Sequence, residues 1–236
     1  MIIRFIKKQS FQPDLRGIFV NPFFYIRYDL FNSISEFASS LSGKLIDFGC
    51  GRKPYRNLIN VSEYIGVDIE QSGHDHSNSE IDVFYNGKEI PFPENTFDSL
   101  FCAEVIEHIF DPEIILPELN RVLKKGGKAL FTVPFIMNEH EMPYDYGRYT
   151  IAGLTHLLNR HGFTILESRK SGHYTKALVQ LFSLYIYELF KKLGKTGHVL
   201  SLILIVPWHI LSFPFILLFP KNKSLYFNTV ILCEKK

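Results

Sequence analysis

The stretch that decides the fold is Lys44-Leu-Ile-Asp-Phe-Gly-Cys-Gly-Arg-Lys-Pro54. Its first five residues are an apolar run that predicts a short buried strand, and the glycines at 49 and 51 follow directly. Glycines at the end of a strand let the backbone pass close to a ligand. Asp47 precedes them, as expected for a ligand that carries an ammonium group, and Pro54 can open a helix. An ordinary tight turn is the alternative interpretation.

A second apolar run, Tyr64 to Ile69, also predicts a buried parallel strand, and it contains the acid Asp68 near its end. Asp68 follows Gly49 by 19 residues. At this separation an acid in such folds accepts hydrogen bonds from ribose hydroxyls. A solvated aspartate at a strand end is the alternative, and the pairing with the first motif favours a ribose-binding role.

Strands and helices alternate along the chain, which predicts a doubly wound α/β sheet with ligands outside the carboxyl ends of its strands. Helices are predicted for residues 21–41, from Asp111-Pro112 to Gly126-Gly127, and from Thr150 to Gly162. Further strands are predicted for Ser99–Ala103, Lys128–Val133, Phe163–Ser168 and Leu225–Cys233. The segment between Asp68 and Ile81 is short and rich in serine and glycine, so we expect one crossover helix to be vestigial.

A nicotinamide-dependent oxidoreductase is the obvious rival on this fold class. The dinucleotide fingerprint has a third glycine, which lets helix and strand pack closely beside a pyrophosphate. Pro54 stands in that place here. The sequence therefore disfavours a dinucleotide site.

Five segments, in the right order, resemble the successive motifs of the class I S-adenosylmethionine (SAM) dependent methyltransferase family, in the branch that includes the ubiquinone and menaquinone methyltransferases. They are LIDFGCGRKPY, YIGVDIE, EIPFPENTFDSLFCAEVIEHI, RVLKKGGKALFTVP and HGFTILE, and they cover about residues 44–168. The resemblance implies a Rossmann-like seven-stranded sheet with a reversed last strand, SAM as cofactor, and transfer of its activated methyl group.

Carried over by position, the resemblance also implies the cofactor contacts. The methionine side of SAM would be lined by Asp47, Gly49, Cys50 and Gly51. The ribose side would be held by Asp68 and Ile69, and the sulfonium end would lie near Glu104 and the Glu107-His108 pair. Asn86 falls near the adenine, where many relatives have an aspartate, so this contact departs from the family pattern.

The segment from Pro134 to Tyr149 follows the fifth strand and should form the acceptor side of the pocket. It resembles a sub-branch found among enzymes of surface-polysaccharide and lipid-linked sugar assembly. A hydroxyl acceptor needs a base, for which His140 is the first candidate and Glu139, Glu141 and His108 are the others. Substrate contacts are predicted for Tyr144, Asp145, Tyr146, Arg148 and Tyr149. The alternative is a purely structural ion pair of Arg148 with Asp145 or Glu141.

Two histidine clusters contain side chains that can bind metals, His74-Asp-His76 and Glu139-His140-Glu141. Neighbouring residues in a chain rarely point at one ion, and neither cluster has the cysteines or the helical spacing typical of zinc sites. We therefore predict that no metal is required.

Composition limits the classes of partner and the cellular compartment that we expect for the protein. Lys and Arg number 26 and Asp and Glu 24, so a formal charge of +2 gives no strong attraction for nucleic acid. Three cysteines, two of them in apolar runs at Cys50 and Cys102, suit a reducing compartment without disulfides. Lys7 and Lys8 soon follow the first apolar residues, which is unlike a signal peptide. We expect a cytoplasmic protein.

The stretch from Thr196 to Pro220 contains no charged residue, although Pro207 and Pro214 interrupt it. We divide the chain into a helical segment 1–43, a SAM-binding core 44–170, an apolar insertion 171–224 and a last strand 225–236. A single membrane crossing would separate the last two strands of one sheet. We therefore expect peripheral or monotopic contact of residues 177–219 with the inner face of the membrane. A buried cap or a dimer interface is the alternative.

These features predict methyl transfer from SAM to a small-molecule acceptor, which the apolar insertion suggests is lipophilic or a lipid-linked sugar. The alternative is a catalytically inactive relative that binds SAM as a regulatory or scaffold protein.

Overall fold

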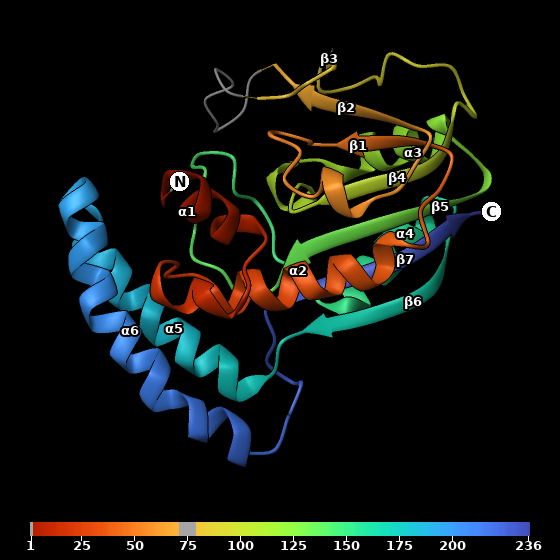
Figure 1. The fold of residues 1–236 in the computed structure, drawn as a ribbon. Coiled ribbons are helices and arrows are strands. Elements are labelled where there is room, and N and C mark those ends of the chain that lie inside the picture. The colour runs from red at the N-terminus through yellow and green to blue at the C-terminus, as the bar shows by residue number, and fades with distance from the viewer. Residues whose placement is uncertain (1, 71–78) are drawn as a thin grey trace. The chain divides into compact units, whose positions relative to one another are not determined.

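The computed structural model describes residues 2–70 and 79–236 and contains a seven-stranded sheet with the order β3-β2-β1-β4-β5-β7-β6 (Figure 1). The strands are β1 (Lys44–Phe48), β2 (Glu63–Ile69), β3 (Val83–Tyr85), β4 (Phe97–Ala103), β5 (Leu123–Pro134), β6 (Phe163–Ser171) and β7 (Asn228–Lys235). The helices are α1 (Ile2–Phe11), α2 (Phe24–Ala38), α3 (Pro112–Val122), α4 (Ile151–Arg160), α5 (Tyr174–Lys191) and α6 (Gly194–Leu218). The predicted seven-stranded α/β fold, with apolar helices between the last two strands, is confirmed.

Strand direction also agrees with the prediction. The first five strands pair in parallel, with β1 between β2 and β4. The last strand is reversed, because Phe227 N donates to Ser171 O at 2.8 Å and Lys236 N donates to Gly162 O at 3.0 Å, so β7 runs opposite to β6. The strand order turns back at β1, and in doubly wound sheets ligands bind at the carboxyl ends beside such a switch point.

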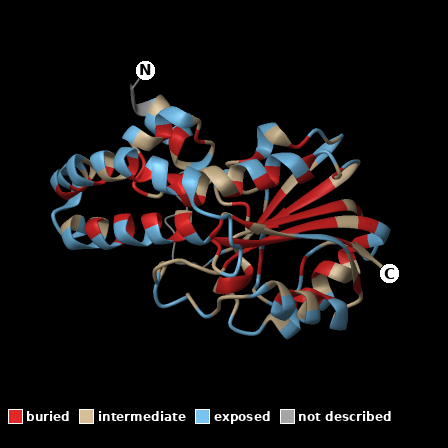
Figure 2. Ribbon diagram, turned by 90° about the horizontal axis from the view of Figure 1, so that it is seen from below, coloured by how far each residue is buried: buried red, intermediate tan, exposed pale blue. Residues whose placement is uncertain are grey.

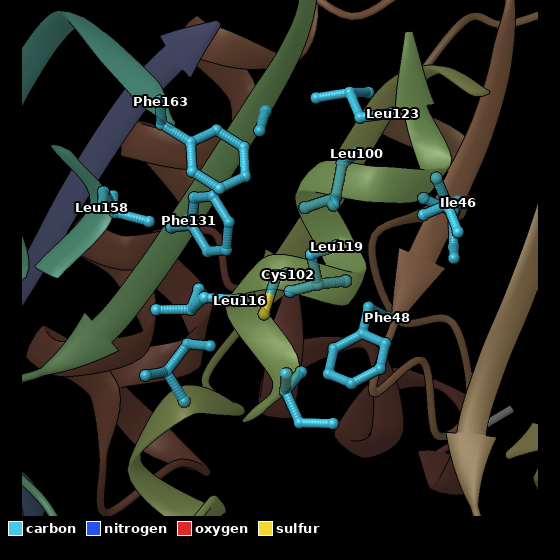
Figure 3. Packing of buried hydrophobic residues seen from close by; sticks show 14 of the residues in the cluster. Ile46, Phe48, Leu100, Cys102, Leu116, Leu119, Leu123, Phe131, Leu158 and Phe163 are labelled. Carbon is cyan, nitrogen blue, oxygen red and sulfur yellow. The ribbon is translucent and has the colours of Figure 1, made fainter. Parts of the chain in front are cut away.

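The chain forms two compact units. The sheet unit comprises residues 33–169 and 229–236, and the helical unit comprises residues 1–32 and 170–228. In the sheet unit, fully buried side chains of the central strands pack with those of α3 and α4, as Figure 3 shows for Phe48, Leu100, Phe131, Leu119 and Leu158. Burial on both faces explains why these strands have continuous apolar sequences.

Two predicted helix starts are confirmed by their caps. Asp111 Oδ1 accepts a hydrogen bond from Glu113 N at 3.1 Å, and Thr150 Oγ1 accepts one from Gly153 N at 3.0 Å. Both bonds satisfy a backbone N–H that has no partner inside its helix.

Some local predictions are wrong. Between β1 and β2 the only helical segment that the structure describes is a 3-10 turn at Arg56–Leu58, so Pro54 opens no α-helix. The connection is short, and Lys53 has a φ of +48°, which an α-helix does not accommodate. Helix α3 ends at Val122 and not at Gly126-Gly127, because Leu123 already pairs with Phe97 in β4. The short strand β3 was not predicted, and most of the expected vestigial crossover lies outside the described residues.

The helical unit contains an antiparallel pair, α5 and α6, joined by a short turn (Figure 1). The two helices bury polar side chains between them: Ser183 Oγ lies 2.8 Å from His209 Nε2, and Trp208 Nε1 donates to Val179 O at 3.0 Å. Their outward faces are apolar and exposed (Figure 2), with Leu211 at 76% and Leu218 at 81% exposure. Apolar side chains are therefore exposed where a helix in water usually presents polar ones.

Candidate active site

Asp47 lies near the carboxyl end of β1 and is buried, with 3% of its surface exposed. The hydroxyl of Tyr64 in β2 donates to Asp47 Oδ2 at 2.6 Å. Burial raises the pKa of Asp47 to about 7, although the Tyr64 hydrogen bond opposes the rise. A nearby cationic group would favour the ionised carboxylate.

The glycines after β1 have different roles. Gly49 has a φ of +73°, and a Cβ there would lie 2.3 Å from Val105 Cγ2, so packing excludes any larger residue. Gly51 has a φ of +48°, and no atom of the described residues lies within 4 Å of the position its Cβ would take. The loop therefore borders open space at Gly51, as expected where a ligand approaches the backbone.

Asp68, near the end of β2, connects this loop to the second strand. Its Oδ2 accepts a hydrogen bond from Gly51 N and its Oδ1 accepts one from Ile69 N, both at 2.8 Å. A carboxylate oxygen can accept more than one hydrogen bond, so this geometry still allows contacts with two adjacent hydroxyls.

The other residues predicted to bind the cofactor lie in different environments. Cys50 is buried, and burial raises the pKa of its thiol, so it is no nucleophile. Ile69 lies beside Gly87, with Cδ1 3.3 Å from the position of a Cβ there. Asn86 is exposed, and its Oδ1 accepts hydrogen bonds from Lys88 N and Glu89 N at 2.9 Å. The side-chain carbonyl of Asn86 thus holds the turn after β3.

The carboxyl end of β4 carries three ionisable side chains. Glu104 has a φ of +57°, and its Oε1 accepts a hydrogen bond from Thr132 Oγ1 in β5 at 2.8 Å. Glu107 is fully buried, and neither of its carboxylate oxygens has a hydrogen-bond partner among the described residues. His108 Nδ1 lies 2.7 Å from Tyr144 O, which fixes the orientation of its ring.

The acceptor segment after β5 folds back onto these residues. Tyr146 N and Gly147 N donate to Glu107 O at 2.8 and 3.1 Å. The rings of His108 and His140 meet edge to face, with centroids 4.8 Å apart. Burial, with His108 nearby, lowers the pKa of His140, so its neutral form persists to lower pH than usual.

Arg148 and Asp145 form the ion pair that the structural alternative predicted, with two contacts of 2.5 and 2.7 Å. The side chain of Asp145 is only 1% exposed, and the Arg148 hydrogen bonds lower its pKa to about 2. Asp145 Oδ2 also accepts a hydrogen bond from His140 N at 2.9 Å. This pair therefore positions the His140 backbone, and its contact with a substrate stays a prediction.

The remaining residues that were predicted to contact the acceptor lie in the same segment. Tyr144 and Tyr146 are 37% and 46% exposed, and Tyr146 meets Phe110 edge to face at 5.2 Å between centroids. Tyr149 is half-buried, Glu141 is partly exposed, and Glu139 is exposed. Exposed aromatic faces of this kind can pack on a ring or a sugar.

Sequence reasoning did not identify Tyr64, Lys53 and Asp82. Lys53 Nζ pairs with Asp82 Oδ2 at 2.5 Å, and Gly66 N donates to the same oxygen at 2.6 Å. Burial opposes ionisation of Asp82, but these hydrogen bonds outweigh it and lower its pKa. In β2, Tyr64 lies two residues from Gly66 and so points to the same face of the sheet, and Gly66 pairs with Asp47. This alternation could have indicated Tyr64 as a neighbour of Asp47.

Known proteins resemble this chain in sequence. The model of the methyltransferase domain family matches residues 46–131. The demethylmenaquinone methyltransferase of Geobacillus sp. (strain WCH70) is 26% identical over 158 residues, which are 53% of this chain and 67% of that protein. Alignments with two further relatives span only 38% and 44% of their lengths.

Solved structures share the fold. The phosphoethanolamine N-methyltransferase 2 of Haemonchus contortus, solved with S-adenosyl-L-methionine, superposes with a TM-score of 0.56 at 17% identity, over 95% of this chain and 58% of that one. The cyclase SpnF superposes with a TM-score of 0.54 at 17% identity, over 89% and 82%. The fold alone therefore does not define the reaction. The domain match and the relatives confirm the resemblance to the class I SAM-dependent methyltransferases over residues 46–131.

Proposed function

We propose that this protein transfers the methyl group of SAM to a small-molecule acceptor. The observation that carries the proposal is the placement of Asp47, Gly51 and Asp68 at the ends of two adjacent parallel strands, within the matched residues 46–131. Asp47 offers a carboxylate to the ammonium group, Gly51 leaves room beside the loop, and Asp68 accepts from the ribose hydroxyls.

Methyl transfer is an in-line displacement in which a sulfonium loses its positive charge, so alignment and exclusion of water supply most of the catalysis. We place the acceptor beside His108 and His140, because these rings and the segment 134–149 lie at the ends of β4 and β5. His140 Nδ1 lies 3.1 Å from Asn138 O, which leaves Nε2 as the nitrogen that can accept a proton.

We further propose that α5 and α6 hold the protein at the cytoplasmic face of a membrane and that the acceptor is lipophilic or lipid-linked. Helix α6 is long and apolar enough to cross a membrane, yet only 28% of its most apolar window is buried. Polar groups between two helices and apolar groups outside them suit a lipid environment. Lys191, Lys192 and Lys195 are exposed at the turn, and Lys221 and Lys223 follow α6, where ammonium groups can reach lipid headgroups.

The hairpin leaves and rejoins the chain at β6 and β7, which belong to one sheet. Both of its ends must therefore lie on the same side of the membrane, in agreement with monotopic or re-entrant attachment. A dimer interface formed by the same apolar faces is the competing account.

Gly51→Val should block the approach of SAM to the loop, and Asp68→Ala should remove the ribose acceptor. We expect each change to weaken SAM binding by about 1.5–3 kcal/mol in calorimetric titration, as for loss of a hydrogen bond to a charged group. Gly126→Val is the matched control, because Gly126 also has a positive φ and open space but lies at the opposite end of β5. Unchanged affinity in both site variants would refute the cofactor assignment.

Asp47→Asn should stabilise the SAM-free protein at alkaline pH while weakening SAM binding. Because burial raises the pKa of Asp47 from 3.8 to about 7, the folded state binds the proton more tightly than the unfolded state. Stability is therefore lost as the pH rises through this range, and an amide does not titrate. Between about pH 5 and pH 8, wild type should lose about 2–3 kcal/mol relative to the Asp47→Asn variant in urea denaturation. Parallel curves for the two proteins would contradict this account.

His140→Ala should leave SAM affinity unchanged and lower turnover by a factor on the order of 10²–10⁴ if His140 takes the proton of the acceptor. Because its pKa is lowered, the wild-type rate should stay high below the ordinary histidine range and fall only at lower pH. His156→Asn is the control, since His156 is exposed on α4. Normal turnover and a normal pH profile in His140→Ala would eliminate the role.

Replacing Leu211 and Leu218 together by glutamate should release the protein from membranes. Both side chains are exposed on α6, and each charge inserted into the lipid face opposes burial there. We expect wild type to sediment with anionic liposomes and the double variant to stay in solution, with Ile114→Glu on α3 as the exposed apolar control. Wild type that is monodisperse without detergent and does not bind liposomes would contradict the membrane proposal, and a stable dimer would favour the interface.

A further inference from the structure

We propose that Glu107, His108 and His140 bind a divalent transition-metal ion at the ends of β4 and β5. One ligand atom from each residue lies within 4.8 Å of those of the other two. This proposal differs from the expectation from sequence that no metal is required. The sequence pattern compares only neighbours in the chain, whereas this cluster joins the adjacent Glu107 and His108 to His140, which lies more than thirty positions further on.

Several buried polar atoms of this cluster have no hydrogen-bond partner among the described residues. Both oxygens of Glu107 and the Nε2 atom of His108 are buried without a hydrogen-bond partner among the described residues. Leaving buried polar groups unsatisfied is costly, and such a group in a native structure calls for an explanation such as an ion. One cation satisfies the carboxylate and the imidazole lone pair together.

The spacing of the ligand atoms also suits a metal ion. His108 Nε2 lies 3.8 Å from Glu107 Oε1 and 3.7 Å from Glu141 Oε2. These separations are too long for hydrogen bonds. Two ligands about 2.0–2.1 Å from a tetrahedral zinc ion are roughly 3.3 Å apart, so small inward movements of the side chains would complete the coordination. Glu141 is within reach as a fourth ligand.

Backbone carbonyl groups hold the two imidazole rings from behind. His108 Nδ1 lies 2.7 Å from Tyr144 O, and His140 Nδ1 lies 3.1 Å from Asn138 O. A carbonyl oxygen only accepts, so each Nδ1 carries the proton and each Nε2 keeps its lone pair. Histidines that bind metals show this arrangement, in which a backbone carbonyl fixes the tautomer and the ring orientation.

A protonated, neutral Glu107 is the competing explanation, because burial and the charge of Glu104 raise its pKa well above the usual range. A neutral carboxyl group, however, has an O–H that needs an acceptor, and the described residues provide none for either oxygen. Imidazole and carboxylate ligands together favour ions such as Zn²⁺, Mn²⁺ or Fe²⁺ over Ca²⁺.

The metal site also indicates that the acceptor is a hydroxyl compound, and this inference rests on the proposed function. A metal beside the acceptor would bind an oxygen and lower the pKa of its hydroxyl. The O–H proton passes to water, the oxygen lone pair bonds to the methyl carbon, and the carbon–sulfur bond breaks to leave a neutral thioether. In this arrangement His108 and His140 are ligands, and His140 is not the base.

The test is metal titration of the tag-free, full-length protein after treatment with EDTA. We expect one Zn²⁺ per chain by calorimetry and one Co²⁺ with the visible spectrum of a low-symmetry site. Glu107→Gln and His140→Ala should lose affinity on the order of 100-fold or more. His156→Asn should bind like wild type. Circular dichroism and thermal unfolding, measured for every variant, show whether the sheet unit is intact.

Absence of a bound ion in wild type, or equal affinity in the variants, would overturn the metal site. The metal site and the proposed methyl transfer can each be refuted without the other. A metal that binds while SAM does not would remove the proposed function and keep the site. Turnover that is unaffected by EDTA, with normal SAM binding, would remove the metal and keep methyl transfer with His140 as its base.

Discussion

The reversal of strand order at β1 is the constraint on which the rest of the site depends. Because β1 pairs in parallel with both β2 and β4, the carboxyl ends of three strands lie at one edge of the sheet. Asp47, Asp68 and Glu104 each stand at or near one of these ends. The continuous apolar strands bury the sheet on both faces, and several of the buried polar groups gather at this edge.

Two carboxylates at this edge, those of Asp47 and Glu107, are buried, and their hydrogen bonds do not make up for the hydration that burial removes. Asp47 accepts from Tyr64, while the nearby Lys53 ammonium group pairs with Asp82. Glu107 has no hydrogen-bond partner among the described residues. A buried carboxylate destabilises the free protein unless it is neutralised or paired. The chain therefore keeps two sites at which a cationic group, an ammonium at Asp47 and a metal ion at Glu107, would relieve this cost.

The sequence predicted what depends on local pattern and missed what depends on tertiary contacts. Strands β1, β4 and β5 were predictable because burial on both faces makes them uniformly apolar. The helix start at Thr150 was predictable because a cap acts within one turn. Pro54 misled, since it follows a residue with positive φ, Lys53, and precedes only a 3-10 turn. The orientation of His108 depends on a backbone carbonyl 36 residues away, at Tyr144, so no spacing in the sequence could indicate that its Nε2 faces Glu107. The exposed apolar faces of α5 and α6 also became visible only when the two helices were paired.

Thermal unfolding of the full-length protein in the presence of SAM or of NAD tests the central claim most directly, because a ligand that binds only the native state raises the apparent stability. The account predicts a rise in the unfolding temperature that grows with SAM concentration, and no rise with NAD, since Pro54 replaces the glycine that a dinucleotide fingerprint requires. Stabilisation by NAD, or no stabilisation by SAM at millimolar concentration, would contradict it.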